Sequence, residues 1–364
     1  MALSCGIVGL PNVGKSTIFN ALTRSAGAAA SKYPNASIEP NVGDVEVPDD
    51  RLRVLAEIVE SDRIIHATMR FTDIAGLVSG SSSGAGLGNA FLSHIRDADA
   101  LAMVVRCFED ADVLHVEGST DPARDVEIVA IEMALADLSS LAKRVDKLTK
   151  EARNDPKAAD KLVAAESLRA ALEDGRPART FGAGSPELDL ARECFMLTAK
   201  PMLYVANVDE KQIAEPGPGV QRLFEIAKEE GTQAIAICGQ IEAELAGLSD
   251  EDATAFREEL KIEHSALDQL ILAAYEQLGL MTFLTAGKKE VRAWTIARGS
   301  KAPQAGRAIH SDIERGFIRA EIVSFDDYDR LRTMEALKAA GLVRSEGKEY
   351  VMREGDVVNF RFNV

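Results

Sequence analysis

The chain has 364 residues, enough for two or three domains, and its hydrophobic fraction of 46% and charged fraction of 27% are typical of a globular protein. A net charge of −16 argues against general nucleic-acid binding and gives no reason to expect sequence-specific DNA recognition. No apolar run approaches the roughly 18–20 residues of a membrane span, and residues 1–6 carry no basic segment or cleavage site. We therefore expect a cytoplasmic protein without a membrane partner.

Short apolar runs separated by helical patterns predict an α/β domain. Residues 3–9 predict a buried strand and residues 15–24 a helix. The alternating segment 42–47 predicts an edge strand, with 69–74 as its neighbour. Further strands are expected at 101–106, 202–206 and 233–238. Such a series indicates a mostly parallel sheet covered by helices on both faces.

A long helical segment interrupts this series. Apolar residues recur there at spacings of three and four, and they are Ile128, Ile131, Leu135, Leu138, Ala142, Val145 and Leu148. Helices are also expected at 160–172 and 187–197, on either side of a loop at 174–186. These features predict an inserted antiparallel helical hairpin. The alternative is that the apolar seam packs on the sheet in the ordinary way.

The last part of the chain differs in composition. Residues 281–364 hold 15 Lys and Arg against 12 Asp and Glu, whereas the rest holds 27 against 46. Strand-like pieces are expected at 291–296, 318–324, 350–352 and 357–362. We predict a separate small α+β module in this tail, with contacts to an RNA-rich partner.

The segment Gly9–Ser16 matches G-x-x-x-x-G-K-[ST] and lies between a predicted strand and a predicted helix. Glycines let backbone N–H groups curl around phosphate oxygens, and the helix N-terminus adds partial positive charge. Lys15 is expected to reach the β- and γ-phosphates in a catalytic role, and the Ser16 hydroxyl to bind Mg²⁺. The predicted nucleotide contacts here are Asn12, Val13, Gly14, Lys15, Ser16 and Thr17.

The tetrapeptide Asp73-Ile74-Ala75-Gly76 ends a predicted strand, as a D-x-x-G motif does. Asp73 would hold Mg²⁺ through water, and the N–H of Gly76 would meet the γ-phosphate during catalysis. The next residue is Leu77, where many GTPases have a glutamine that orients the attacking water. Leucine has no polar atom for this purpose, so the catalytic group must come from elsewhere.

Two loops are candidates for closing over the γ-phosphate. Residues 79–88 are rich in glycine and serine, which is typical of a mobile switch loop, although a plain linker has the same composition. Ser37 offers a hydroxyl that could bind Mg²⁺. Its spacing alone does not distinguish it from an ordinary loop serine.

The segment Asn207-Val208-Asp209-Glu210 follows a predicted strand, where a base-reading loop belongs. GTPases use N-K-x-D there, and the aspartate accepts two hydrogen bonds from guanine. Here Val208 replaces the lysine and Glu210 replaces the aspartate, and the longer carboxylate misplaces both acceptors. We therefore expect poor selectivity for guanine.

Taken together, these residues resemble the YchF-type, Obg-like ATPases of the translation-factor-related P-loop class. The resemblance extends over nearly the whole chain. It is carried by Gly9–Phe19, 37–41, Asp73–Leu92, 104–108, Asn207–Glu210, 241–244, 283–287, Glu290–Ile296, 302–304, 316–318 and Asn359–Val364.

The resemblance implies an α/β P-loop G domain in two parts, 1–120 and 200–280. It implies an inserted antiparallel helical coiled-coil domain at 121–199 and a C-terminal β-grasp (TGS) domain at 281–364. It also implies hydrolysis of ATP in preference to GTP, with Mg²⁺ as cofactor, ATP and ADP as ligands, and association with the ribosome or its large subunit.

The resemblance assigns further site residues. His115 matches the family's proposed catalytic histidine, although a lone histidine beside apolar residues is more often structural. Ser37 stands where the family usually has threonine, and the hydroxyl is kept. Gln240 lies in a Cys-Gly-Gln stretch where the family usually has Cys-Ala-Ala, near the base. Asn12 matches GTPases stimulated by K⁺, which makes K⁺ a weaker second prediction.

The main hypothesis is thus an ATPase whose conformation changes with its nucleotide and which associates with ribosomes. One alternative is a nucleotide-dependent binding module with incidental slow hydrolysis. The other is a GTPase, which the base-reading segment Asn207–Glu210 disfavours.

Overall fold

A computed structural model describes residues 3–25, 41–74, 86–110, 112–113, 115–249, 252–253, 255–256 and 265–363, without the side chains of 25 and 86–91. The chain divides into two compact units. The first unit comprises Met1–Val45 and Arg70–Ala274, and the second comprises Glu46–Met69 and Tyr275–Val364. No helix in the described part of the chain is both long and apolar enough to cross a membrane.

The first unit is built on a six-stranded sheet of order β2-β4-β1-β5-β6-β7. The strands are β2 (Asn41–Glu46), β4 (Thr68–Asp73), β1 (Ser4–Val8), β5 (Ala100–Arg106), β6 (Met202–Asn207) and β7 (Ala234–Ile237). The pairs from β4 to β7 are all parallel. The predicted mostly parallel sheet is confirmed, and so are the edge position of residues 42–47 and their pairing with 69–74.

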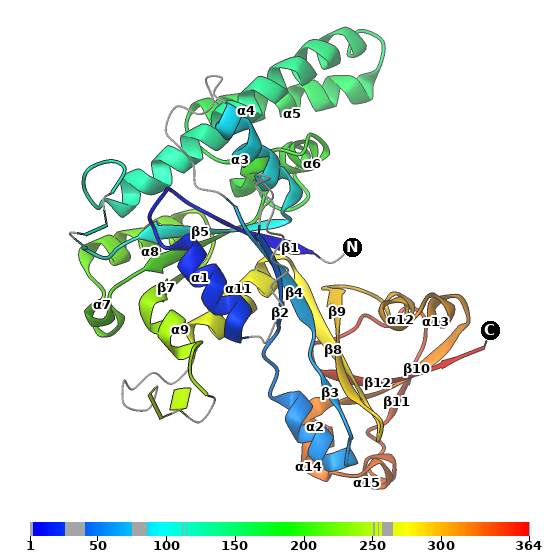
Figure 1. Cartoon of the computed structure of the whole chain (residues 1–364). Helices are drawn as coiled ribbons and strands as arrows, with labels where there is room; N and C mark the ends of the chain where they lie inside the picture. Colours follow the sequence, from blue (N-terminus) through cyan, green and yellow to red (C-terminus); the bar gives the residue numbers. More distant parts are fainter. Residues whose placement is uncertain are drawn as a thin grey trace. The chain divides into compact units, whose positions relative to one another are not determined.

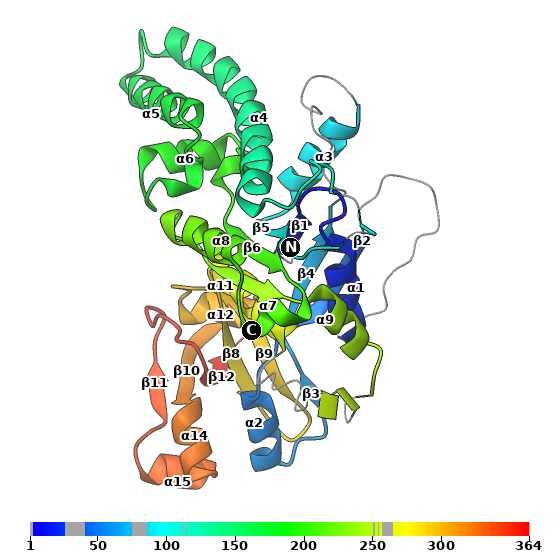
Figure 2. The ribbon, with the colours of Figure 1, turned by 90° about the vertical axis from the view of Figure 1, so that its left-hand side faces the viewer.

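Helices cover the sheet of the first unit. α1 (Lys15–Ser25) packs on α9 (Gly239–Leu245), and α4 (Pro122–Glu151) packs on α8 (Pro218–Glu229). Figure 2 shows these two pairs on opposite sides of the sheet. Every residue of the central strands β5 and β6 is buried, because both faces of the sheet are covered. Other helices of this unit include α3 (Gly86–Asp97), α7 (Glu210–Ala214) and α11 (Ala266–Gln277).

The interruption between β5 and β6 contains three helices, α4, α5 (Pro156–Glu173) and α6 (Pro186–Glu193), which extend from the sheet (Figure 1). Each begins at a side chain that caps its first turn, namely Asp121, Asp155 and Ser185, and each has proline at its start. Short 3-10 turns, η2 (Ala178–Thr180) and η3 (Leu197–Ala199), follow α5 and α6. The predicted helix at 187–197 thus ends at Glu193.

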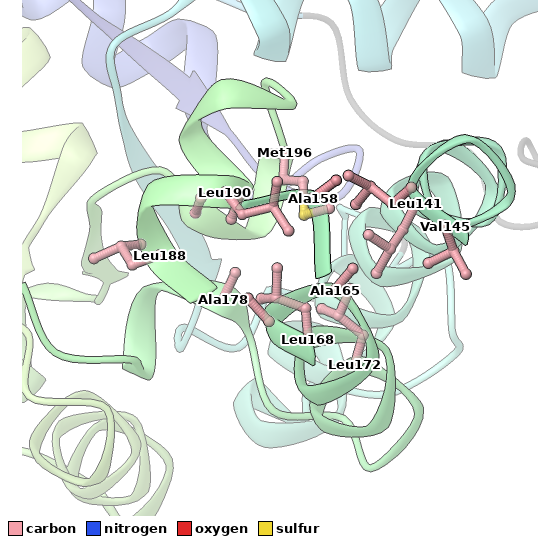
Figure 3. Close-up of a cluster of buried hydrophobic side chains, with 14 residues drawn as sticks. Leu141, Val145, Ala158, Ala165, Leu168, Leu172, Ala178, Leu188, Leu190 and Met196 are labelled. Atoms are coloured by element: carbon pink, nitrogen blue, oxygen red, sulfur yellow. The ribbon is translucent and has the colours of Figure 1, made fainter. Parts of the chain in front are cut away.

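The two halves of α4 have different neighbours. In the second half, Leu141, Val145 and Leu148 pack against α5 and α6 in one apolar cluster (Figure 3). In the first half, Val126, Val129 and Met133 face the central strands, beside Met103 and Tyr204. Only the second half therefore packs as an independent hairpin would.

The predicted seam of α4 is wrong in its first half, and in its second half Ala142 is exposed while Leu141 is buried. Ile131 and Leu135 are 48% and 47% exposed, whereas Asp125, Glu132 and Asp137 are buried. The apolar pattern missed the buried face because that face carries carboxylates. Asp137, for example, accepts hydrogen bonds from the N–H groups of Leu197 and Thr198.

The second unit has its own six-stranded sheet, of order β11-β10-β12-β8-β9-β3. The strands are β11 (Arg344–Glu346), β10 (Phe317–Ser324), β12 (Asp356–Phe362), β8 (Leu280–Ala286), β9 (Val291–Ala297) and β3 (Ile64–Ile65). Three predicted strands of the tail correspond to β9, β10 and β12. The predicted strand at 350–352 is wrong, because the segment forms only an isolated bridge between Val351 and Lys301.

Helices complete the second unit. They are α2 (Arg51–Val59), α12 (Ala302–Ile309), α13 (Ser311–Arg315), α14 (Phe325–Leu331) and α15 (Met334–Ala339). The apolar cluster under α12 and α13 includes Phe283, Phe317 and Phe360, whose rings meet edge to face. This cluster is the core around which the tail folds.

Residues 46–69 fold with the tail, although the predicted boundaries placed them in the first part of the G domain. Within the second unit, β3 pairs with β9 in parallel. Arg51 binds Asp49 at 2.7 Å and Glu354 at 2.7 Å. Glu354 also accepts a hydrogen bond from the N–H of Thr282. The apolar pattern of 46–69 could not indicate the partners in the tail, Glu354 and β9, which are more than 200 residues away in sequence.

The substitution Asp137→Ala is expected to destabilise the first unit by about 2–4 kcal/mol. The carboxylate is 2% exposed and accepts hydrogen bonds from Leu197 N at 2.9 Å, Thr198 N at 2.8 Å and Thr198 Oγ1 at 2.6 Å. Removing it leaves three buried donors without an acceptor. Chemical denaturation followed by circular dichroism measures the effect. The exposed Asp146→Ala on the same helix is the control, and equal effects of both substitutions would contradict the prediction.

Candidate functional site

The turn between β1 and α1 needs glycine at two positions. Gly9 has a φ of +146° and lies so close to β5 that a Cβ would come 2.3 Å from the carbonyl oxygen of Val104. Gly14 has a φ of +98°, and a Cβ there would come 2.1 Å from Nδ2 of Asn207. Both positions therefore exclude side chains, for conformational and steric reasons. The turn has the strand–loop–helix context that a phosphate-binding loop requires.

Asn207 holds this turn in place with its side-chain amide. Nδ2 donates to the carbonyl oxygen of Val13 at 2.8 Å, and Oδ1 accepts from the N–H of Gly239 at 3.0 Å. Its backbone oxygen accepts from the N–H of Cys107 at 2.8 Å. Asn207 was predicted as a nucleotide contact, and the structure gives its buried side chain a scaffolding role at the edge of the cavity described below.

Lys15 and Ser16, at the start of α1, lie beside Asp73 at the end of β4. Nζ of Lys15 donates to the carbonyl oxygen of Leu10 at 2.7 Å, and Oγ of Ser16 donates to Oδ2 of Asp73 at 2.9 Å. Burial lowers the pKa of Lys15 to about 8, and the charge of Asp73 opposes this shift. Burial also raises the pKa of Asp73, against the effects of Ser16 and Lys15. The hydroxyl and the carboxylate are hard oxygen donors, which Mg²⁺ prefers, so the pair fits the predicted metal site.

A cavity of about 730 Å³ opens beside this loop. Its volume is within the range of small-molecule sites. Among the residues predicted to bind nucleotide, those that line it are Asn12, Gly14, Thr17, Asn207, Val208, Glu210 and Gln240. Val13 belongs to the loop but is buried, so it does not line the cavity. Ser37, Gly76, Leu77 and most of the segment 79–88 lie outside the residues that the structure describes.

The residues of the base-reading segment Asn207–Glu210 have different structural roles. Asp209 caps α7 by accepting from the N–H of Gln212 at 3.0 Å, so its carboxylate is used within the helix. Val208 is buried, and Glu210 is exposed at the cavity. Gln240 donates through Nε2 to Oε1 of Glu244 at 3.3 Å, which fixes one end of its amide.

One wall of the cavity follows β5 and was not predicted from the sequence. Phe108, Glu109, Asp110 and Val113 line it, and the buried guanidinium of Arg106 organises them. Arg106 donates to the carbonyl oxygens of Phe108 at 3.1 Å, Asp110 at 3.0 Å and Val113 at 2.7 Å. The sequence did offer one signal for this wall. These residues directly follow a predicted strand, and ligands bind at the carboxyl ends of parallel strands.

His115 lies further along the same loop and is not among the described residues that line the cavity. Its Nε2 is 2.9 Å from Oδ2 of Asp125 in α4, and the two side chains are 4% and 1% exposed. Its Nδ1 accepts a hydrogen bond from the N–H of Glu117 at 3.1 Å. The catalytic role of His115 stays a prediction, and in this conformation the ring is held by α4.

These features define a P-loop nucleotide-binding protein: a tight glycine turn after β1, a buried lysine at the start of α1 and a serine–aspartate pair beside it.

Two family models match the chain. One is described as "50S ribosome-binding GTPase" and matches residues 4–144. The other represents the C-terminal region of YchF GTPases, carries the description "Protein of unknown function (DUF933)", and matches residues 280–363.

Full-length relatives complete the identification. The chain is 49% identical to the "Ribosome-binding ATPase YchF" of Bacillus subtilis and 46% identical to that of Escherichia coli O157:H7, over 100% of each chain. The structure of the Schizosaccharomyces pombe YchF GTPase is similar with a TM-score of 0.87 and 36% identity, over 99% of this chain and 98% of that one. The chain belongs to the YchF family.

A more distant solved structure shares the fold. It is a GTP-binding protein from Pyrococcus horikoshii, with a TM-score of 0.60 and 18% identity over 99% of this chain and 100% of that one. At this identity the likeness concerns the fold alone.

Binding of ATP at pH 8.5 is expected to take up protons through Lys15. In the free protein, burial lowers the pKa of Lys15 to about 8, so much of the amine is neutral at pH 8.5. Bound phosphates favour the charged form. Affinity therefore falls as pH rises between about 8 and the ordinary lysine value of 10.5. Calorimetric titration in buffers of different ionisation enthalpy measures the uptake. In Lys15→Arg the guanidinium stays charged, so this uptake should disappear. Equal uptake by both proteins would contradict the assignment.

Proposed function

We propose that the chain is an Mg²⁺-dependent ATPase whose conformation changes with the bound nucleotide and which associates with ribosomes in the cytoplasm. The observation that carries the proposal is the grouping of Lys15, Ser16 and Asp73 at the glycine turn. The names of the full-length relatives support the ATPase activity and the ribosomal partner.

The residues of the site have distinct roles in this proposal. The N–H groups of Gly9–Ser16 and the amine of Lys15 bind the phosphates, and Lys15 leaves the carbonyl oxygen of Leu10 to do so. Ser16 and Asp73 hold the metal ion, with Ser37 as a further ligand. When bound, the ion neutralises charge on the phosphates. Gly76 offers its N–H to the γ-phosphate. K⁺ as a second ion rests on Asn12 alone.

The proposed preference for ATP rests on the residues that line the cavity. Its described lining includes the carboxylates of Glu109, Asp110, Asp209, Glu210 and Glu244, and no lysine or arginine. The 6-amino group of adenine can donate to such a carboxylate, whereas the 6-oxo group of guanine cannot. The N1–H and 2-amino donors of guanine would need an aspartate in place of Glu210. Val208 contributes an apolar surface for the base. Gln240 lies on the same side, with its Nε2 held by Glu244.

We assign the remaining parts by family resemblance. α4, α5 and α6 correspond to the coiled-coil insertion, within 121–199, and the tail sheet corresponds to the β-grasp TGS domain, within 281–364. The G domain then comprises 1–120 and 200–280, apart from the segment 46–69 that folds with the tail. The tail, with its charge balance of +3, is the candidate ribosomal anchor.

His115 is the proposed water-orienting group. Leu77 has no polar atom for this role, and phosphoryl transfer depends mainly on positioning and charge stabilisation. In the described conformation, however, the imidazole is bound to Asp125. This contact favours a second candidate function, a nucleotide-dependent binding module whose slow hydrolysis is incidental.

Lys15→Ala is expected to abolish nucleotide-dependent Mg²⁺ binding and ATP turnover without unfolding the chain. The substitution removes the only buried amine described in the phosphate-binding loop Gly9–Ser16. Turnover is measured with and without ribosomes, beside the exposed control Lys211→Ala. Undiminished turnover in folded Lys15→Ala would refute the ATPase site. A wild-type rate that ribosomes leave unchanged, together with nucleotide-dependent ribosome binding, would favour the binding module.

ADP is expected to bind at least as tightly as GDP, because Val208 and Glu210 replace the guanine-reading lysine and aspartate. Titration of fluorescent ADP and GDP analogues in one buffer measures the ratio. The double variant Val208→Lys, Glu210→Asp restores the GTPase pattern and is expected to shift the ratio toward GDP by about tenfold or more. A wild-type preference for GDP of about tenfold, equivalent to 1.4 kcal/mol, would overturn the assignment.

A further inference from the structure

The loop between β5 and α4 connects the cavity wall to the helical insertion. In its first part, Phe108, Asp110 and Val113 line the cavity, and their carbonyl oxygens accept hydrogen bonds from the guanidinium of Arg106. Its last part is fixed to the first turn of α4, where Asp125 binds His115. We propose that Asp125 is a positioning residue that keeps His115 withdrawn, and that ATP hydrolysis requires the imidazole to leave this carboxylate. The inference rests on the proposed water-orienting role of His115.

The hydrogen bonds of His115 occupy both ring nitrogens. Because Nδ1 accepts from the N–H of Glu117 at 3.1 Å, the proton of the neutral ring is on Nε2. Nε2 then donates to Oδ2 of Asp125 at 2.9 Å. A ring with both nitrogens engaged, and 4% exposed, has no free donor or acceptor for an attacking water. The described conformation is therefore unable to use His115 in hydrolysis.

The hydrogen bond to His115 also stabilises the buried carboxylate of Asp125. Its carboxylate is 1% exposed, and its second oxygen, Oδ1, has no hydrogen-bond partner among the described residues. The guanidinium of Arg124 lies 3.6 Å from Oδ1 and is itself engaged with Ser119. Loss of His115 would leave a buried charge with a single partner, which is unfavourable unless the first turn of α4 moves. Release of His115 is thus coupled to this turn.

The position of Asp125 explains how the insertion could influence the site. α4 runs without a break from Asp125 to the apolar cluster that it forms with α5 and α6. A displacement of that cluster is therefore transmitted along a single helix to the partner of His115. The withdrawn state keeps hydrolysis slow until such a displacement occurs, which gives the insertion control over the rate.

Asp125→Asn tests the proposal with almost no change of shape. The amide still accepts a hydrogen bond from Nε2, but without the charge, so the contact weakens. Single-turnover ATP hydrolysis is expected to rise by about 3–10-fold, as the difference between charged and neutral hydrogen bonds implies. Nucleotide affinity should stay unchanged. Glu127→Gln, which neutralises an exposed acid of the same helix turn, is the control and should leave the rate at the wild-type value.

The double variant separates this inference from the proposed function. If Asp125 acts through His115, then Asp125→Asn has no effect on the rate in the His115→Ala background. A His115→Ala protein that hydrolyses ATP at the normal rate removes the proposed role of His115, and the inference with it. If His115→Ala is slow but Asp125→Asn is equally slow or unchanged, then His115 keeps its role and the withdrawn state is refuted.

A spectroscopic measurement does not depend on the stability of the variants. Histidine ¹⁵N chemical shifts of the wild-type protein report which ring nitrogen carries the proton. Without nucleotide, His115 is expected to show a protonated Nε2 and an unprotonated Nδ1. With Mg²⁺, ADP and aluminium fluoride, which imitate the transition state, the His115 signals should move as the bond to Asp125 breaks. Unchanged His115 signals in this complex would overturn the proposal.

Discussion

The carboxamide of Asn207 is the contact on which the site depends. It binds the phosphate-loop residue Val13 and the first residue of α9, Gly239, while its backbone oxygen binds the segment after β5. Three stretches, of which the first and last are more than 200 residues apart, thus meet at one residue. Gly14 must lack a Cβ because this amide occupies the space. The cavity exists where it does because β5, β6 and β7 end at the same edge of a parallel sheet.

Buried charged groups then determine the rest of the first unit. Arg106 fixes the cavity wall, Asp125 holds His115, and Asp137 binds the turn that leads into β6. Each is buried and accepts or donates hydrogen bonds within the fold, although Oδ1 of Asp125 has no partner among the described residues. This arrangement makes the base of the helical insertion sensitive to any event that changes one of these bonds.

The second unit shows the same dependence on charged partners. Residues 46–69 join the tail through Arg51, which binds Asp49 and Glu354, and through the strand pair of β3 and β9. Because this segment lies between β2 and β4 in sequence, the chain enters the second unit and returns before the metal-binding Asp73 of the proposed site. The chain therefore crosses between the units three times, once on each side of this excursion and once within α11.

The sequence by itself determined the elements whose signals are local. The glycine turn before Lys15 and the strands of the parallel sheet follow from backbone conformation and from continuous apolar runs. Only the tertiary structure decided which face of α4 is buried, that 46–69 pairs with the tail, and that His115 lies against Asp125. These outcomes depend on hydrogen bonds between distant polar groups, and such bonds leave no periodic pattern in the sequence.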